Sequence, residues 1–298
     1  MQQHWNRLIS PAAKTISEKS DLLGIELPQF TDIPSPIPEV PFWNNRSLLS
    51  FFGLQTHPFA DSLNTVFFYQ SDIHEEALLK MQMSVEHDIS FGLITGKSGT
   101  GKTLLSQILL ERLPRNRFKP ILVPVTPKQS PSAFLKTILA TLGEPSISKD
   151  LQALIQHISE RILEISASGI KPVLFLDECH FLSAEALQLL RTLSNFESAN
   201  KKLITCLLFA EDSFLRRLSH PAYASLKSRM YLRIFLEPLN ADECKQYIHF
   251  RLMSAGLEKA DLFDDSEIAD IHTQSAGIPR CINQQCFQRM ANRFLAER

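Results

Sequence analysis

Glycine and long hydrophobic runs are both scarce in this sequence. Only 10 of its 298 residues are glycine, about half of the usual share. Uninterrupted apolar stretches such as Leu207–Ala210 are far shorter than the roughly 18 residues that a membrane-spanning helix needs. The first residues, MQQHWNRLIS, lack the apolar core of a signal peptide. We therefore expect a soluble, cytoplasmic protein without a membrane span.

Net charge and paired cysteines are also lacking. The chain has 31 basic and 32 acidic residues and a net charge of −1, which excludes a global field that attracts nucleic acid or anionic membranes. An odd number of cysteines without paired metal-ligand spacing predicts reduced thiols in the cytosol. The cysteines are Cys179, Cys206, Cys244, Cys281 and Cys286.

Proline is concentrated in the first part of the chain. The stretch LPQFTDIPSPIPEVPFW is incompatible with a regular helix or a central strand and favours an extended path. We assign residues 1–48 to an N-terminal extension or linker. The alternative is a docking segment for a partner, in which Phe42 and Trp43 act as anchors.

From residue 90 onward, short apolar segments alternate with amphipathic ones, which predicts a parallel sheet covered by helices on both faces. SPSAFLKTILATLG and SAEALQLLRTLSNF read as helices, the second with Ser183 as N-cap. After Pro238 only helical patterns follow, with stop signals at Gly256 and Gly277. We expect an α/β core at 49–237 and a helical lid at 238–298. The expected strands are Phe91–Thr95, Pro120–Val125, Pro172–Leu176, Leu203–Phe209 and Tyr231–Leu236.

Three of the ten glycines fall within six positions, in ITGKSGTGKTL at residues 94–104. The stretch fits G-x-x-x-x-G-K-[ST] between a predicted strand and a predicted helix, which is the setting of a phosphate-binding P-loop. Lys102 would neutralise the β- and γ-phosphates, and the Thr103 hydroxyl would bind Mg²⁺. The predicted nucleotide-binding residues are Gly96, Lys97, Ser98, Gly99, Thr100, Gly101, Lys102, Thr103 and Leu104.

A second element expected beside a P-loop is an apolar strand that ends in acidic residues, and PVLFLDE fits it. Because side chains alternate along a strand, its two terminal acids diverge and can serve two roles. Asp177 would hold Mg²⁺, and Glu178 would polarise the attacking water.

Together, GKSGTGKT, LFLDE and the helical lid resemble the AAA+ ATPases, and within them the ExeA/GspA-type ATPases of secretion and pilus assembly. Transposition regulators of the TnsC/TniB/MuB kind are relatives. Further motifs shared with this branch are FFGLQTHPF, SDIHEEALLKM, LQLLRTLSNFES, LKSRM and SAGIPRCINQQC. The resemblance implies a P-loop NTPase fold with a five-stranded parallel sheet in the order 5-1-4-3-2. It also implies ATP hydrolysis at the interface between subunits of a homo-oligomer, a ring or a filament.

The resemblance also assigns roles to residues outside the two main motifs. Arg229 in LKSRM corresponds to the arginine that reaches into a neighbour's site, and Arg280 in GIPR to the lid arginine on the γ-phosphate. His74 and Glu75 fall where the family packs residues near the adenine; a solvated helix face is the alternative. One departure is LLFAEDSF, where relatives carry a polar amide toward the attacking water. Either Glu211 faces away from the γ-phosphate, or its carboxylate repels that phosphate. In the second case hydrolysis would be slow or partner-dependent.

The sequence thus predicts an ATPase that binds ATP and Mg²⁺, oligomerises and remodels or licenses a protein partner, with a secretion or pilus machine as the first choice. A second hypothesis is a transposition regulator that coats double-stranded DNA through Lys128, Lys149 and the Lys201–Lys202 pair. A third is a nucleotide-switched binding module with little turnover.

Overall fold

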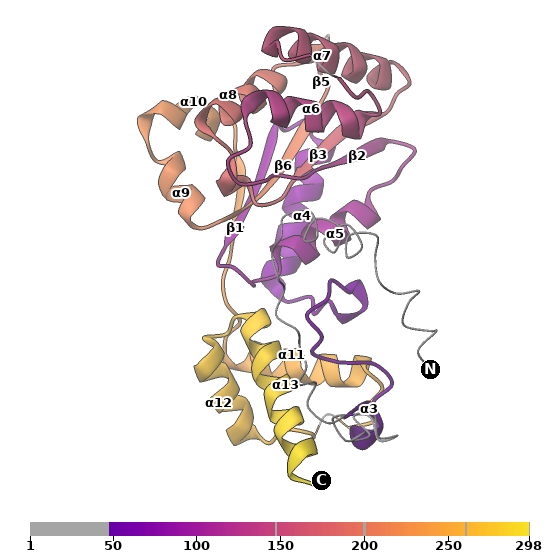
Figure 1. The fold of residues 1–298 in the computed structure, drawn as a ribbon, viewed down its shortest axis with the longest axis vertical. Helices are drawn as coiled ribbons and strands as arrows, with labels where there is room; N and C mark the ends of the chain where they lie inside the picture. The colour runs from indigo at the N-terminus through magenta and orange to yellow at the C-terminus, as the bar shows by residue number, and fades with distance from the viewer. Residues whose placement is uncertain (1–47, 147, 199–200, 260, 298) are drawn as a thin grey trace, which may run out of the picture. The chain divides into compact units, whose positions relative to one another are not determined.

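The computed structural model describes residues 48–146, 148–198, 201–259 and 261–297, and Leu48–Arg298 forms one compact unit. The proline-rich segment with Phe42 and Trp43 lies outside the described residues, so its two interpretations stay predictions. The sheet and the helices around it are shown in Figure 1.

A five-stranded parallel sheet forms the centre of the α/β core, in the order β2-β3-β6-β1-β7. Read from β7, with the strands of this sheet numbered along the chain, the order is 5-1-4-3-2, which confirms the prediction. The observed bounds differ from the expected ones by up to two residues. The strands are β1 (Phe91–Gly96), β2 (Phe118–Val123), β3 (Lys171–Leu176), β6 (Thr205–Glu211) and β7 (Leu232–Leu236). A separate hairpin joins β4 (Glu197–Ser198) to β5 (Lys201–Lys202).

Successive residues of the central strands enter two different hydrophobic clusters. Leu174 and Leu176 of β3 pack with α6, α7 and α8 on one face, whereas Phe175 packs with α4 and α5 on the other. Figure 1 shows these two groups of helices on opposite sides of the sheet. Burial on both faces explains why the central strands β1, β3 and β6 are mostly apolar, whereas the edge strands β2 and β7 are partly exposed. The helices are α4 (Asp72–Glu86), α5 (Lys102–Arg112), α6 (Pro131–Leu142), α7 (Leu151–Ala167) and α8 (Ala184–Leu193).

Local capping determines where several of these helices begin and end. The Ser130 hydroxyl accepts a hydrogen bond from Ala133 N, and α6 stops at Gly143, which has a left-handed backbone. The Ser183 hydroxyl accepts from Ala186 N at the start of α8, which confirms the predicted N-cap. Shorter helices connect β3 to β6 and β6 to β7: η2 (Cys179–Phe181), α9 (Ser213–Leu218), η3 (Pro221–Tyr223) and α10 (Ala224–Lys227).

The C-terminal lid consists of α11 (Ala241–Ser254), α12 (Asp265–Ser275) and α13 (Pro279–Ala296). Gly256 and Gly277 follow α11 and α12 with positive φ, as expected. A third hydrophobic cluster joins the lid helices to Leu54, Phe59 and Phe67. The segment that holds α3 (Leu48–Phe52) and η1 (Thr65–Phe67) therefore packs on the lid although it precedes the sheet in the chain.

Candidate functional site: the P-loop edge of the sheet

The P-loop connects β1 to α5 at the edge where all five parallel strands end. Gly101 is the N-cap of α5 with φ 98°, a conformation that side chains with a Cβ rarely adopt. At Gly96 a Cβ would lie 2.7 Å from the Leu236 carbonyl oxygen of β7 and 2.9 Å from Thr100 Oγ1. Both glycines are therefore needed for the shape of the loop, which leaves backbone N–H groups at the helix start for an anion.

The Lys102 side chain lies inside this loop and binds its backbone. Its Nζ donates hydrogen bonds to the carbonyl oxygens of Gly96, at 2.9 Å, and Lys97, at 2.8 Å. An ammonium group has three donors, so one N–H is left for a phosphate oxygen. Burial lowers the pKa of Lys102, and four nearby carboxylates oppose this shift: Glu178, Glu211, Asp177 and Asp212. The site thus has a lysine cation among several acids.

The predicted Mg²⁺ ligands lie together. The Thr103 hydroxyl donates a 2.7 Å hydrogen bond to Asp177 Oδ2, which links the start of α5 to the end of β3. Asp177 Oδ1 accepts from the backbone N–H of Glu178 at 2.9 Å. A hydroxyl and a carboxylate are oxygen donors of the kind that Mg²⁺ binds beside phosphates, so this pair fits the ion.

Glu178 has a left-handed backbone, with φ 54°. Its Oε2 lies 3.3 Å from His180 Nδ1, and its side chain is 44% exposed. A second acid, Glu211, lies near the same imidazole. It stands at the end of β6 and is paired in register with Gly96 of β1. Glu211 Oε2 lies 3.9 Å from His180 Nε2. Both acids therefore stand beside the P-loop, on either side of one imidazole. Ligand atoms of these three side chains lie within 4.8 Å of one another.

The two predicted arginines lie in different places. Arg280, in α13, contacts the P-loop: its backbone N–H donates to the Gly99 carbonyl oxygen at 3.2 Å, and its Nη1 lies 3.5 Å from Ser98 Oγ. Arg229 donates instead to Ser194 Oγ, at 3.1 Å, and to Asn195 Oδ1. In the described residues it is thus held by its own chain at the end of α8, and a role in a neighbour's site stays a prediction.

His74, in the first turn of α4, is buried beside the P-loop. Its Nδ1 lies 2.7 Å from Ser71 Oγ, and desolvation lowers its pKa, while a backbone hydrogen bond with Thr100 opposes this. A cavity of about 40 Å³ beside His74 is lined by aromatic rings such as Phe68 and Tyr247. A second cavity, of about 120 Å³, runs along Lys102, Thr103, Glu178 and Arg280. Glu75, by contrast, is exposed.

Sequence reasoning assigned no role in the nucleotide site to two residues of this region. Arg251 of α11 is buried and lines both cavities; its guanidinium donates to the Pro58 carbonyl oxygen and to the Tyr247 hydroxyl. His180 follows the acid pair directly, and that proximity in the sequence was the available signal. Arg251 had none, because its contacts depend on how the lid packs.

Among the described residues, no cysteine belongs to a cluster of possible metal ligands. All five are free, and Cys179, next to the acid pair, is buried with Sγ 2.9 Å from the Leu176 carbonyl oxygen. Burial raises the pKa of the Cys179 thiol well above its ordinary value, so the thiol is an unfavourable metal ligand.

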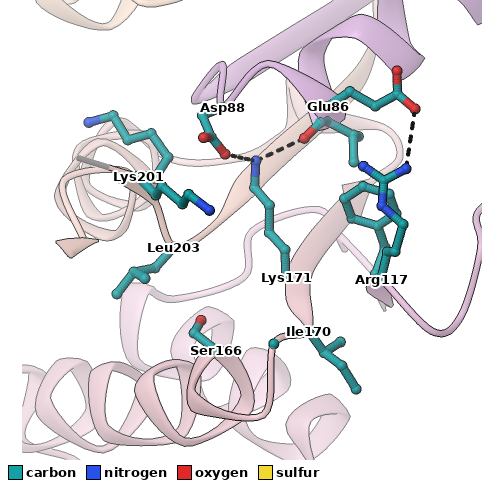
Figure 2. Close-up of a pocket in the computed structure, with 12 residues that line it drawn as sticks. Glu86, Asp88, Arg117, Ser166, Ile170, Lys171, Lys201 and Leu203 are labelled. Carbon is teal, nitrogen blue, oxygen red and sulfur yellow. Dashed lines mark hydrogen bonds and ion pairs between the residues drawn. The ribbon is translucent and has the colours of Figure 1, made fainter. Parts of the chain in front are cut away.

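A larger cavity, of about 310 Å³, lies where strands β2 and β3 begin, at the ends opposite the P-loop (Figure 2). Its half-buried cation, Lys171, donates to the Val85 carbonyl oxygen at 2.9 Å and to Asp88 Oδ1 at 2.8 Å. These bonds tie the end of α4 to the start of β3 and hold Asp88, whose φ is 55°. Burial lowers the pKa of Lys171, and the Asp88 hydrogen bond opposes this. We assign these residues a structural role, because the cation is already paired and caps a helix end.

Comparison with known proteins gives one matching family model, one curated relative and several solved structures of similar fold. A family model described as AAA domain matches residues 85–218. The General secretion pathway protein A of Aeromonas hydrophila is 32% identical over 249 residues, which are 82% of this chain and 44% of that protein. The chain therefore spans less than half the length of this relative.

Solved structures with a similar fold include Cdc6p from Pyrobaculum aerophilum, with a TM-score of 0.60 and 17% identity over 81% of this chain and 66% of that chain. The ORC1 protein of Aeropyrum pernix, solved in complex with DNA, has a TM-score of 0.57 and 18% identity over 79% of this chain and 63% of that one. At such identities the likeness shows the fold alone. No helix among the described residues is long and apolar enough to cross a membrane.

Proposed function

We propose, from the premise that this chain is an AAA+ protein of the ExeA/GspA-like branch, that it binds ATP with Mg²⁺ and hydrolyses it. The observation that carries the proposal is the 2.7 Å hydrogen bond between Thr103 and Asp177. It brings the P-loop helix and the acid-ended strand together at the carboxyl edge of the sheet, where ligands of such folds bind.

Each group has a task that its position supports. The P-loop N–H groups and Lys102 would bind the phosphate chain, and Arg280 would add a guanidinium from the lid. Thr103 and Asp177 would hold Mg²⁺, which when bound draws charge from the β- and γ-phosphate oxygens. Glu178 would orient the attacking water and accept its proton. The aromatic-lined cavity beside His74 would receive the base.

We further propose that the protein works as a cytoplasmic homo-oligomer that remodels or licenses a partner complex of a secretion or pilus machine. The relation to General secretion pathway protein A supports this version. Free thiols at all five cysteines support a reducing compartment.

A transposition-type regulator on double-stranded DNA is the alternative, and exposed lysines favour it. Lys128, Lys149 and Lys201 are exposed, whereas Lys202 pairs with Glu197. Since the net charge is −1, DNA binding would require many subunits that each neutralise about one phosphate. The third version, a switch with little turnover, is supported by the carboxylate of Glu211 beside the phosphate site.

The first test separates binding from hydrolysis. A fluorescent ATP analogue should bind the wild-type protein tightly, and Lys102→Ala should lose this binding while circular dichroism shows an intact fold. Glu178→Gln should bind the analogue normally yet hydrolyse ATP at least a hundredfold more slowly. If Glu178→Gln hydrolyses ATP at the wild-type rate, Glu178 is not the group that activates the water. If Lys102→Ala binds the analogue as tightly as the wild-type protein, the P-loop is not the nucleotide site.

The second test distinguishes the two partners. ATPase rates and gel shifts are measured with duplexes of increasing length, at low and moderate salt. We expect little response. ATP-dependent shifts that grow with duplex length and disappear in Lys128→Glu or Lys201→Glu, with basal ATPase activity retained, would establish the DNA-based version instead.

A further inference from the structure

The carboxylate of Glu178 depends on a single neighbour for its position. Among the described residues it has no hydrogen-bond or ion-pair partner other than His180, at 3.3 Å, and its side chain is 44% exposed. A glutamate with rotatable bonds and high exposure samples many orientations unless a partner selects one. Whatever fixes His180 therefore also determines where this carboxylate lies.

His180 is itself held firmly. Its side chain is 13% exposed, and its ring packs against Phe181 with centroids 4.1 Å apart. The backbone N–H of Glu211 donates to its Nδ1 at 3.4 Å. Arg217 lies 3.5 Å from the His180 carbonyl oxygen and also donates to the Leu182 carbonyl oxygen. The imidazole is thus the fixed member of the pair, and Glu178 is the adjustable one.

The Nδ1 atom of His180 faces one donor and one acceptor. With its proton on Nε2, the neutral ring accepts the Glu211 N–H at Nδ1 and turns Nε2–H toward Glu211 Oε2, 3.9 Å away. With the proton on Nδ1, the ring donates to Glu178 and cannot accept from Glu211. The two tautomers hold different partners, so the orientation of Glu178 is linked to the end of β6, which lies beside Gly96 of the P-loop.

Charge gives a reason for this arrangement. Glu178 and Glu211 both stand near Lys102, and two carboxylates that share a site repel each other and any phosphate between them. An imidazole between the two carboxylates donates an N–H to one of them and separates it from the other. From these contacts we propose that His180 is a positioning residue for ATP hydrolysis, which directs Glu178 toward the attacking water and couples it to the end of β6. This inference rests on the proposed ATPase function.

The test compares two substitutions of His180 in the full-length protein. His180→Ala removes the ring and should lower kcat about tenfold or more, because a displaced reacting group loses rate steeply, while KM and the affinity for the ATP analogue stay within about twofold. His180→Gln offers an amide N–H and an amide oxygen, one for each partner of Nδ1, and should recover most of the lost rate.

His220 supplies the matched control. It too accepts a backbone N–H at Nδ1, from Ala222 at 3.2 Å, but it is exposed and lies outside the site. His220→Ala should leave kcat unchanged. An unchanged kcat in His180→Ala, or an equal loss in His180→Gln and His180→Ala, would overturn the proposal. Absence of hydrolysis by the wild-type protein would instead contradict the proposed function, so the two failures are distinguishable.

Discussion

The hydroxyl of Thr103 and the carboxylate of Asp177 share a 2.7 Å hydrogen bond, although 74 positions separate the two residues in the chain. The bond aligns the two oxygen groups that we propose as Mg²⁺ ligands beside the P-loop. Its strength of about 1.5–3 kcal/mol, typical of a hydrogen bond to a charged group, keeps this arrangement ready for Mg²⁺.

The first prediction concerns this pair. Thr103→Val retains the shape of threonine but removes the hydroxyl, so the Mg²⁺ concentration for half-maximal ATPase activity should rise about tenfold or more. Thr103→Ser keeps the hydroxyl and should shift it by less than about threefold. A Mg²⁺ titration of both variants measures this, and an unchanged midpoint in Thr103→Val would exclude Thr103 as a ligand.

The second prediction tests whether the site is shared between subunits. If Arg229 acts on a neighbour's nucleotide, Arg229→Ala should bind the ATP analogue normally and hydrolyse ATP at least tenfold more slowly. Mixing it with Lys102→Ala should restore activity, because some interfaces then combine an intact P-loop with an intact arginine.

Arg216→Ala is the control for this experiment, because Arg216 is an exposed arginine on the nearby α9. It should hydrolyse ATP at the wild-type rate. If mixed oligomers of Arg229→Ala and Lys102→Ala are demonstrated and no ratio restores activity, the role of Arg229 in trans is wrong.

The third prediction is a pH dependence of stability. The pKa of buried His74 is lowered from 6.5 by desolvation, so below about pH 6.5 the unfolded chain binds a proton that the folded chain does not. Stability should therefore fall as the pH drops from 6.5 toward the lowered pKa. In His74→Gln, the free energy of unfolding should change less between about pH 7.5 and about pH 5.5.

Some pH dependence should remain in that variant, because desolvation also lowers the pKa of His57. Urea unfolding at the two pH values, for the wild-type protein and His74→Gln, makes the comparison. Equal pH dependence in both proteins would contradict the prediction.

The fourth prediction concerns the joint between the lid and the core. Gly277 has φ 71°, and a Cβ there would lie 2.0 Å from the Leu239 carbonyl oxygen. Gly277→Ala should therefore combine backbone strain with overpacking and cost about 2–5 kcal/mol of unfolding free energy. At Gly143, with φ 92°, a Cβ would meet nothing within 4 Å, so Gly143→Ala should cost about 1–2 kcal/mol. Equal losses in the two variants, measured by urea unfolding, would argue against the close contact at Gly277.

Local features were predictable from the sequence because each depends on neighbours in the chain. The helix that starts after Ser130 and stops at Gly143, and the P-loop with Lys102 and Thr103, are of this kind. Their caps, glycines and charges act within a few residues. The central strands β1, β3 and β6 were found for a similar reason, since a strand covered on both faces must be mostly apolar, whereas the edge strands β2 and β7 are partly exposed. Strand ends were less exact, because hydrogen bonds with neighbouring strands decide them.

Contacts between distant segments were decided by the tertiary structure. His180 faces Glu211 because β3 and β6 are neighbours in the sheet and end at the same edge. Phe67 packs on the lid although it precedes the sheet, since burial of an aromatic ring is favourable wherever the fold brings an apolar surface near it. The sequence alone therefore determined the groups that we propose for phosphate-binding chemistry, through short motifs whose residues act locally. The folded chain decided which side chains surround that chemistry, because packing depends on proximity in space and not in sequence.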